Sequence, residues 1–330
     1  MASLAGVTSN PSYTAVDRKE IPISNINAMT VARTFKEHAD GVTGLGILDQ
    51  NRFISGSYDK SIKVWQKSSE NSLKTCDVDD KNSIWHMQVL NQACLAIGWA
   101  AQDLSNPAIK IYNFMNDQSH DLLGHQNFVY SLAVSQQGLL ASGSEDGSVK
   151  IWEPFSSKNL HTYYYYPQLI VFCVDFSPDG KTVVCGAQLR DQIYQIQMWE
   201  ITSAKPDNRP PDKFFQTTCQ VCAILVMKDG RIVSGSVDGW VRVWDPSKSP
   251  DKALIREMGG HYGNVTSLAE RPDHLIVSGS SDKTIMLCNV DTGDSWRSPE
   301  EHTNGIQAVA AFDDNSILTA SLDKTVKLWV

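Results

Sequence analysis

The 330-residue sequence lacks the features that would place a protein in a membrane or outside the cell. No apolar run approaches the roughly 18 residues that a membrane-spanning helix needs. Residues 1–13 are rich in Ser, Asn and small residues, without a basic stretch followed by an apolar core, so we expect no secretory signal. The seven cysteines are odd in number and show no framework spacing, which favours reduced thiols in the cytoplasm or in the nucleus.

Positive charge is also scarce. The sequence has 29 Lys and Arg against 37 Asp and Glu, which gives a net charge of -8. Because Lys and Arg drive binding to phosphate backbones, this balance argues against a nucleic-acid partner. The sequence contains no Gly-rich phosphate loop, no HExxH motif and no long helical period, which removes the common nucleotide and zinc-protease signatures.

What the sequence has instead is a repeat. In five segments an Asp is followed six positions later by a Trp or Cys: Asp59 and Trp65, Asp146 and Trp152, Asp238 and Trp244, Asp282 and Cys288, and Asp323 and Trp329. Four of the five have a His 21 residues before the Asp: His38, His125, His261 and His302. Two weaker copies end at Tyr112 and Trp199, so that the seven markers lie on average 44 residues apart. This period is typical of four-stranded propeller blades.

The local pattern agrees with strands. Runs such as residues 61–65 and 240–244 alternate apolar and polar residues with period two, and Asp-Gly or Asp-Lys pairs fit tight turns between them. The sequence therefore predicts an all-β fold of seven blades.

Two junctions and one dipeptide carry a family resemblance: Leu123-Gly-His125, Gly259-Gly-His261 and Trp244-Asp245. With them the sequence resembles the WD40-repeat family over about residues 29 to 330, which implies a seven-bladed β-propeller. At residue 330 the seventh blade has three strands, while residues 29–38 read as a fourth strand with no blade before it. We therefore expect this N-terminal strand to complete the last blade and close the ring. The expected organisation is a short tail over residues 1–22 and a single propeller over residues 23–330.

A set of His, Ser or Thr, Asp and Trp recurs at fixed spacing and resembles a catalytic triad. A triad is needed once, at one concave site, whereas this set is repeated around the ring. In the family that the chain resembles, these residues form a buried hydrogen-bond network, so we assign them a structural role. The complete sets are His38, Ser55, Asp59 and Trp65 in blade one, His125, Ser142, Asp146 and Trp152 in blade three, and His302, Thr319, Asp323 and Trp329 in blade seven.

The other blades depart from this set. Blade five has Thr217 in place of His, and blade six has Cys288 in place of Trp. Blades two and four keep neither the spacing nor the full set, and the turns that lead to their markers are longer. This degeneracy is either drift or a partner site built on extended turns.

Three further features have a structural and a functional interpretation. Cys219-Gln-Val-Cys222 has no second ligand pair for zinc and stands at the entry to a strand, so we interpret both as inert thiols. Tyr163–Tyr166 falls on the outer strand of blade three, where alternate rings would face the neighbouring sheet and the solvent, or form an aromatic edge for a partner. Lys205–Asp212 reads as a long Pro-rich loop. We expect no metal and no cofactor.

The resemblance implies a non-enzymatic scaffold or adaptor for protein–protein interaction, with other proteins or peptides as partners, and we expect it to be monomeric by itself. One alternative is a reader of a short peptide motif or a modified tail, as in a ubiquitin-ligase or chromatin-complex adaptor. A propeller enzyme is the remote alternative, because no unrepeated acid–base set is found.

In the family, the residues three and five places after the turn His, and the residue before the turn Asp, lie at the rim of the central channel. In blades two to four those places hold Ser83 and Trp85, Phe128 and Tyr130, and Ile170 and Phe172, with Tyr58 beside them. All of these except Ser83 are large apolar or aromatic residues. The other blades carry mostly small or polar residues: Gly41 and Thr43, Gln220 and Cys222, Asn264 and Thr266, Gly305 and Gln307. We expect a protein-binding site biased toward blades two to four. The alternative is that these rings only plug the channel.

Overall fold

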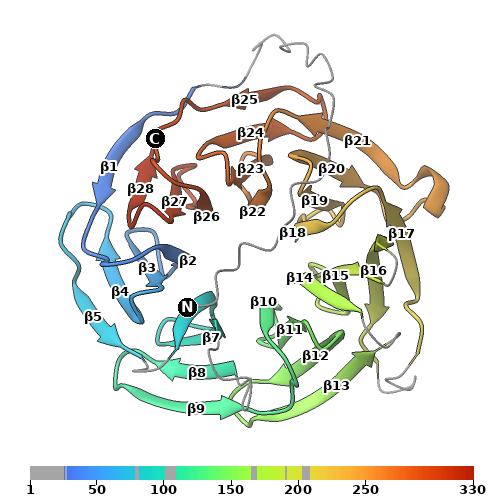
Figure 1. Ribbon diagram of the computed structural model, residues 1–330, viewed down its shortest axis with the longest axis horizontal. Coiled ribbons are helices and arrows are strands. Elements are labelled where there is room, and N and C mark those ends of the chain that lie inside the picture. Colours follow the sequence, from blue (N-terminus) through green and yellow to red (C-terminus); the bar gives the residue numbers. More distant parts are fainter. Residues whose placement is uncertain are drawn as a thin grey trace.

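Seven four-stranded antiparallel sheets stand around a central channel like the blades of a propeller (Figure 1). The computed structural model describes residue 26 and residues 28–78, 82–100, 109–164, 169–189, 192–202 and 209–330. The expected tail over residues 1–22 lies outside this part of the chain. The prediction of a seven-bladed all-β propeller is confirmed.

The first four blades follow the sequence, each from its inner strand outward. Blade one contains β2 (Val42–Ile47), β3 (Arg52–Ser57), β4 (Ser61–Gln66) and β5 (Lys74–Asp77). Blade two contains β6 (Ser83–Val89), β7 (Cys94–Ala100), β8 (Ile109–Asn113) and β9 (Gln118–Leu122). Blade three contains β10 (Val129–Val134), β11 (Leu140–Ser144), β12 (Ser148–Glu153) and β13 (Lys158–Tyr164). Blade four contains β14 (Ile170–Phe176), β15 (Thr182–Gln188), β16 (Tyr194–Glu200) and β17 (Lys213–Thr217).

The remaining three blades complete the ring. Blade five contains β18 (Val221–Val226), β19 (Ile232–Ser236), β20 (Trp240–Trp244) and β21 (Leu254–Gly259), with the short 3-10 helix η2 (Pro250–Lys252) before its last strand. Blade six contains β22 (Val265–Glu270), β23 (Leu275–Ser280), β24 (Ile285–Asn289) and β25 (Ser295–Arg297). Blade seven contains β26 (Ile306–Ala311), β27 (Ile317–Ser321), β28 (Val326–Trp329) and β1 (Val31–Phe35).

The N-terminal strand closes the ring, as the sequence predicts. β1 pairs antiparallel with β28, with Val31 opposite Trp329 and Phe35 opposite Val326. Two backbone hydrogen bonds of 3.0 Å between Thr30 and Val330 extend this pairing. The last blade is therefore built from both ends of the propeller, and its third strand is not left as an open edge.

Apolar side chains pack between blades rather than within them. Seven buried clusters each join two successive blades, so every sheet shares a core with both of its neighbours. Between blades seven and one, the ring of Phe35 meets Phe53 at 4.9 Å and Trp65 at 5.3 Å between centroids. Because each contact is between neighbours, stability of the ring depends on every junction being filled.

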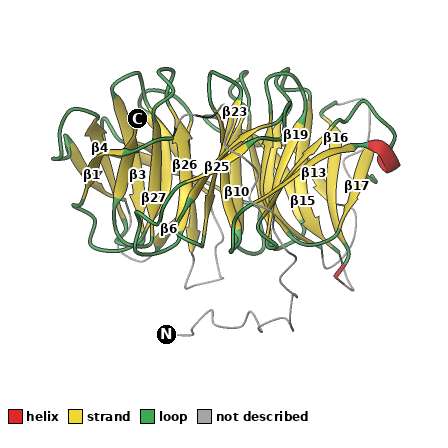
Figure 2. Ribbon diagram, turned by 90° about the horizontal axis from the view of Figure 1, so that it is seen from above, coloured by secondary structure: helices red, strands yellow, loops and turns green. Residues whose placement is uncertain are grey.

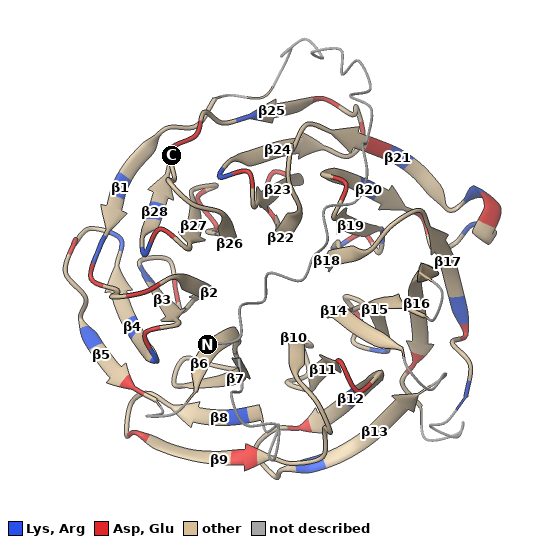
Figure 3. Cartoon of the chain, viewed as in Figure 1, with Lys and Arg blue, Asp and Glu red and all other residues tan. Residues whose placement is uncertain are grey.

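Side chains of the outer strands also form hydrogen bonds to the next blade in the ring. In six junctions a side chain of an outer strand bonds to a backbone carbonyl of the next blade. Five of these carbonyls lie in the turn between the third and fourth strands, and that of Glu200 is the last of the third strand. The side chains are Arg33, Lys74, His120, Tyr163, Lys213 and Arg256. Charged residues lie mostly on the outer strands and in the turns (Figure 3), whereas the seven inner strands contain only Asp175 and Glu270.

The antiparallel order separates two faces of the ring (Figure 2). One face carries the loops that lead into each inner strand and the turns between second and third strands. Because these loops contain the four turn histidines, we name it the His-turn face. The turns between first and second, and between third and fourth strands, lie on the opposite face.

Candidate interaction face

The complete sets form a chain of hydrogen bonds in each of three blades. In blade one, His38 Nδ1 donates to Asp59 at 2.8 Å, Ser55 Oγ lies 2.7 Å from His38 Nε2, and Trp65 Nε1 donates to Ser55 Oγ at 2.7 Å. The same three contacts join His125, Asp146, Ser142 and Trp152 in blade three at 2.8, 2.6 and 2.8 Å. They join His302, Asp323, Thr319 and Trp329 in blade seven at 2.8, 2.6 and 3.0 Å.

The Asp of each set fixes the turn in which it lies. In blade three, Asp146 accepts hydrogen bonds from His125, from the backbone N–H of Gln126 and from both the backbone and the hydroxyl of Ser148. Burial alone would raise the pKa of Asp146, but the bonds from His125 and Ser148 outweigh it and hold this pKa well below 3.8. Burial also lowers the pKa of His125. The pair thus holds an ionised carboxylate beside a largely buried imidazole.

In each set the hydroxyl, the imidazole and the carboxylate follow one another in the order of a nucleophile, a base and an orienting acid. The hydroxyl is nevertheless not accessible to a substrate. Ser55, Ser142 and Thr319 are 0% exposed. Each hydroxyl oxygen also accepts the indole N–H of its Trp and lies within hydrogen-bond distance of its His Nε2, so it is already bonded on both sides inside the blade. A substrate carbonyl cannot reach these oxygens, and the sets act within the fold.

Blades five and six keep parts of the set. His261 still joins Asp282 and Ser278, while Cys288 is fully buried in the place of the Trp. In blade five, Trp244 Nε1 donates to Ser234 Oγ at 2.9 Å, but Asp238 pairs with Arg242 at 2.7 Å. Thr217, in the place of the His, donates to the carbonyl of Cys219.

Blades two and four anchor their marker rings by other contacts. Tyr112 donates its hydroxyl to Asp117 at 2.6 Å, and Trp199 Nε1 donates to the carbonyl of Arg209 at 3.3 Å. Both partners lie in the connection between third and fourth strands, on the face opposite the His-turn face. The longer turns of these blades on the His-turn face include residues 101–108 and 190–191, which fall outside the described part of the chain.

A β-bulge aims one side chain of every inner strand. The register of each inner strand skips a single residue near its start, and that residue is left unpaired: Thr43, Trp85, Tyr130, Phe172, Cys222, Thr266 and Gln307. A bulge bends the strand and redirects the side chain of the extra residue. These seven positions are the places five residues after the turn His. The side chain of Thr43 is buried and donates to the carbonyl of Ile84 in the next blade, whereas those of Trp85, Tyr130 and Phe172 are partly exposed.

Three successive bulges and one turn bring four rings together. The ring of Tyr58 lies 6.2 Å from that of Trp85, Trp85 lies 6.2 Å from Tyr130, and Tyr130 lies 5.7 Å from Phe172, between centroids. All four side chains are partly exposed. We name these four residues the aromatic arc. It runs from the edge of blade one across the inner strands of blades two, three and four, with polar or small side chains at the bulges of the other blades.

The structure gives the other predicted binding residues different surroundings. Ser83 donates its hydroxyl to the carbonyl of Tyr58 at 3.0 Å and so positions the first ring of the arc. Phe128 and Ile170 are partly exposed at the same rim, and no ring contact joins Phe128 to the arc within the described residues. The carbonyl of Phe128 accepts the N–H of Glu145, the residue before the turn Asp in blade three.

Two acidic residues of this face were not predicted. Burial raises the pKa of Tyr130 to about 12, and the charge of the Glu145 carboxylate adds to this shift. Burial raises the pKa of Tyr58 to about 12 as well, and the charge of Asp40 contributes. The sequence held the signal, since Glu145 occupies in blade three the place that Tyr58 occupies in blade one.

The Cys-x-x-Cys pair and the described part of the tyrosine run have structural roles. Burial, aided by Asp238, raises the pKa of Cys219, and burial raises that of Cys222 to about 12, so both thiols stay protonated. Tyr163 is buried and stacks on Trp199 at 5.6 Å, while Tyr164 is exposed, so the rings alternate as predicted. Tyr165 and Tyr166, and the part of the Pro-rich loop up to residue 208, lie outside the described residues.

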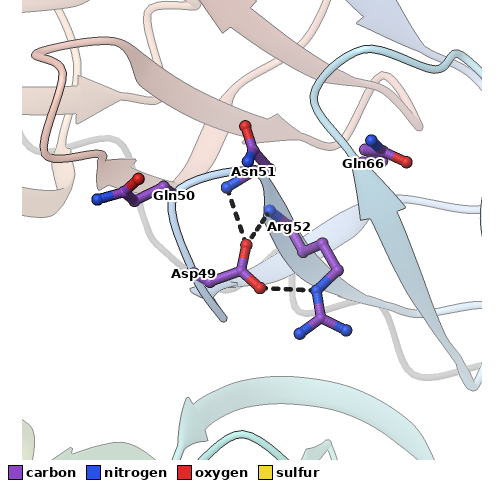
Figure 4. A pocket seen from close by; sticks show the side chains of 5 residues that line it. All are labelled: Asp49, Gln50, Asn51, Arg52 and Gln66. Atoms are coloured by element: carbon purple, nitrogen blue, oxygen red, sulfur yellow. Dashed lines mark hydrogen bonds and ion pairs between the residues drawn. The ribbon is translucent and has the colours of Figure 1, made fainter.

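Neither a metal cluster nor a membrane helix is found in the described part of the chain. Within those ranges, no three His, Cys, Asp or Glu side chains group to hold a metal ion. There, too, no helix is long and apolar enough to cross a membrane. A hollow of about 390 Å³ on the opposite face is lined by Asp49, Gln50, Asn51, Arg52 and Gln66 (Figure 4). Asp49 in this hollow already accepts hydrogen bonds from the backbone N–H groups of Asn51 and Arg52 and from the Arg52 guanidinium. Its carboxylate therefore stabilises the turn itself.

Comparison with known proteins agrees with this architecture. The family model described as "WD domain, G-beta repeat" matches residues 29–66, 116–153, 157–192, 210–245, 252–289 and 293–330. The chain is 25% identical over 218 residues to the guanine nucleotide-binding protein subunit beta of Oryza sativa subsp. japonica, covering 63% of this chain and 57% of that protein. It is 24% identical to protein tipD of Dictyostelium discoideum, covering 62% of this chain and 40% of that one.

A solved structure shows the same fold. The WD40 β-propeller domain of Doa1 superposes with a TM-score of 0.76 at 20% identity, over 92% of this chain and 97% of that domain. This likeness concerns the fold alone. The chain spans little more than half the length of the rice protein, so what the full-length relatives do is not carried over with the fold.

Proposed function

Because this chain belongs to the WD40-repeat family, we propose that it is a non-enzymatic scaffold for protein–protein interaction, whose partner binds the aromatic arc on the His-turn face. The rice relative is by name a subunit, which supports a role inside a multi-protein assembly. Propellers of this family fit such a role because a rigid ring presents loops and turns from several blades on one surface.

The observation that carries the proposal is the aromatic arc. Its four rings are all partly exposed, and each contacts the next one in the row. Together they form a continuous patch. Trp and Tyr are enriched in binding hot spots because they desolvate a large area with few rotatable bonds. The bulges that aim these rings lie in strands packed on both sides, so the patch is preorganised and loses little entropy on binding.

Two further observations support binding rather than catalysis. The Ser, His and Asp sets are repeated around the ring, and their hydroxyl oxygens are buried and already bonded. The partly exposed groups at the channel rim are mainly aromatic and amide side chains, without a nucleophile hydrogen-bonded to a base there among the described residues. A surface of this kind suits recognition of a side chain or peptide.

A reader of a short peptide motif is the second candidate, and the size of the arc favours it. Its rings come from the inner strands of three successive blades and one neighbouring turn, which is a narrow part of the face. Such a patch matches a few residues of a peptide rather than a whole domain.

The test compares captured partners from the native cell. Tagged wild type, the double variant Trp85→Ala/Tyr130→Ala and a control Tyr262→Ala are purified under identical conditions, and co-purifying proteins are quantified by mass spectrometry. Tyr262 is a fitting control because it is 74% exposed on the same face but lies on blade six, away from the arc. We expect the double variant to lose a partner that wild type and control retain, with melting temperatures nearly equal. Undiminished capture by the double variant would move the interface to the opposite face or the blade edges.

We also propose that the protein works in the cytoplasm or the nucleus and is monomeric by itself. Its seven cysteines are all free, which fits a reducing compartment. Imaging of the tagged chain tests the location, and light scattering during size-exclusion chromatography tests the monomer.

A further inference from the structure

The aromatic arc is a platform and not a cage. Its rings touch one another, with centroids 5.7 to 6.2 Å apart, so no side chain fits between two of them. A ligand group must therefore lie across the ring faces or edges that point to the channel mouth. A flat group gains more contact area on such a platform than a compact, rounded one.

Elsewhere in this chain, ring faces are covered by the chain's own cations. Lys67 lies 4.1 Å from the centroid of Phe312, and Arg297 lies 4.2 Å from that of Tyr262. Arg209, Lys213 and Arg242 lie 5.6 to 6.0 Å from Tyr163, Phe215 and Trp240. None of the Lys and Arg side chains in the described ranges covers a ring of the arc. The arc is thus a set of electron-rich surfaces without the cation that other rings of the molecule have.

Carboxylates stand at two places along the arc. The backbone N–H of Glu145 bonds the carbonyl of Phe128 at 2.9 Å, which places Glu145 beside the strand of Tyr130, and its charge acts on Tyr130. Asp40 precedes Gly41, whose carbonyl accepts the N–H of Tyr58 at 2.9 Å, and the charge of Asp40 acts on Tyr58. The net charge of -8 adds a long-range field of the same sign. Both the rings and their surroundings therefore favour a positive ligand.

We infer, on the basis of the proposed function, that the arc binds an arginine side chain presented by the partner protein. A guanidinium is planar and stacks on aromatic faces, and its five N–H donors can fork to a carboxylate at the edge of the ring. Trp85 and Tyr130, in the middle of the arc, hold the guanidinium plane, and Glu145 accepts its N–H groups. A lysine ammonium is compact and strongly hydrated, so it gains less from an open platform.

The test uses short peptides on the full chain. The probes are acetyl-Ala-Ala-Arg-Ala-Ala-amide and the same peptide with citrulline or lysine in place of the arginine. Citrulline keeps the planar shape and loses the charge. Binding is followed by the indole N–H signal of Trp85 in the nitrogen–proton NMR spectrum, assigned with the variant Trp85→Phe.

We expect millimolar concentrations of the arginine peptide to shift the Trp85 signal in a saturable manner, with at least fivefold weaker binding of the citrulline and lysine peptides. Glu145→Gln should weaken the arginine peptide about fivefold while leaving the citrulline peptide unchanged, because only the charge is removed. Glu300→Gln is the matched control, since this exposed carboxylate pairs with Lys283 on blade six and should have no effect.

Several outcomes would overturn the inference. An unshifted Trp85 signal with the arginine peptide, equal binding of the citrulline peptide, or equal or tighter binding of the lysine peptide would each do so. None of these results contradicts the proposed function. That proposal is contradicted only if the variant Trp85→Ala/Tyr130→Ala still captures the partner. A partner that is captured through the arc but binds equally well after its arginines are changed to glutamine also overturns the inference alone.

Discussion

Replacing Asp146 by alanine tests the structural role of the repeated sets most directly. The carboxylate accepts hydrogen bonds from four donors: His125 Nδ1 at 2.8 Å, Gln126 N at 2.9 Å, Ser148 N at 2.8 Å and Ser148 Oγ at 2.6 Å. Its own side chain is 10% exposed and that of His125 is 1% exposed. Water can reach the Gln126 N–H, but the donors around His125 and Ser148 are left unsatisfied inside the blade. At about 1 kcal/mol for each of the three remaining donors, His125 Nδ1, Ser148 N and Ser148 Oγ, Asp146→Ala should lower the free energy of unfolding by about 3 kcal/mol.

The assay is urea unfolding followed by tryptophan fluorescence at pH 7, with Asp121→Ala as control. Asp121 is an exposed carboxylate that pairs with Lys110 at 3.2 Å, so its loss should cost less than about 1 kcal/mol. The hydrogen-bonded Asp146 has a pKa below 3.8 in the folded state, so its contribution is complete above that value and is lost as the pH falls below it. The gap between wild type and Asp146→Ala should therefore shrink below about pH 4. Equal midpoints of wild type and Asp146→Ala at pH 7 would refute the reasoning, and loss of a catalytic activity at unchanged stability would favour an enzyme.

Further changes test the ring and its pH dependence. Deleting residues 1–36 removes β1 and the buried Phe35, so the melting temperature should fall by many degrees. Deleting residues 1–20 should leave the melting temperature unchanged. Equal melting temperatures of the two truncated proteins would contradict closure of the ring by β1. His86 Nδ1 accepts the N–H of Leu132 from the next blade, and burial lowers the His86 pKa to about 4. Its contribution to stability is complete above about pH 6.5 and is lost as the pH falls toward 4, so His86→Asn should flatten the slope of stability against pH in this window. Asp175 accepts the N–H groups of Phe176 and Val226, and burial raises its pKa to about 6. Because this pKa is raised in the folded state, the contribution of Asp175 to stability is complete below about pH 4 and is lost as the pH rises from about 4 to 6. Asp175→Asn should remove this opposite slope; if urea midpoints measured across pH 4 to 7 keep the wild-type slopes in both variants, the assigned linkages are wrong.

The sequence was sufficient for the architecture because each blade repeats the same physical solution. A period of 44 residues, strands with period two and a His placed 21 residues before an Asp all describe one sheet. Closure followed from an unpaired strand at each end, and the structure pairs Val31 with Trp329. Ring closure was predictable because an open edge is costly in any sheet of this kind.

The site could be predicted only in part. The places five residues after the turn His gave Trp85, Tyr130 and Phe172, but the bulge that aims them depends on register, which the alternation of apolar residues does not reveal. The sequence also did not show that the Ser83 hydroxyl bonds the carbonyl of Tyr58, or that the charge of Glu145 acts on Tyr130. The Ser83 bond joins two neighbouring blades, so repeat spacing within one blade carries no information on it. Glu145 and Tyr130 lie in one blade, and the repeat gave the place of Glu145 but not its effect on Tyr130.

The degenerate blades and the aromatic arc occupy the same sector of the ring, and the structure explains how both can be accommodated. Blades two and four fasten their marker rings through Asp117 and the carbonyl of Arg209, on the face opposite the arc. Their His-turn ends are thereby released from holding a buried His and Asp and can vary in length. Blade three lies between them and keeps its complete set, and its Tyr130 is the ring that contacts both Trp85 and Phe172. A binding surface needs a rigid centre that keeps the rings in place, and the hydrogen-bonded set of blade three provides one in the blade of Tyr130.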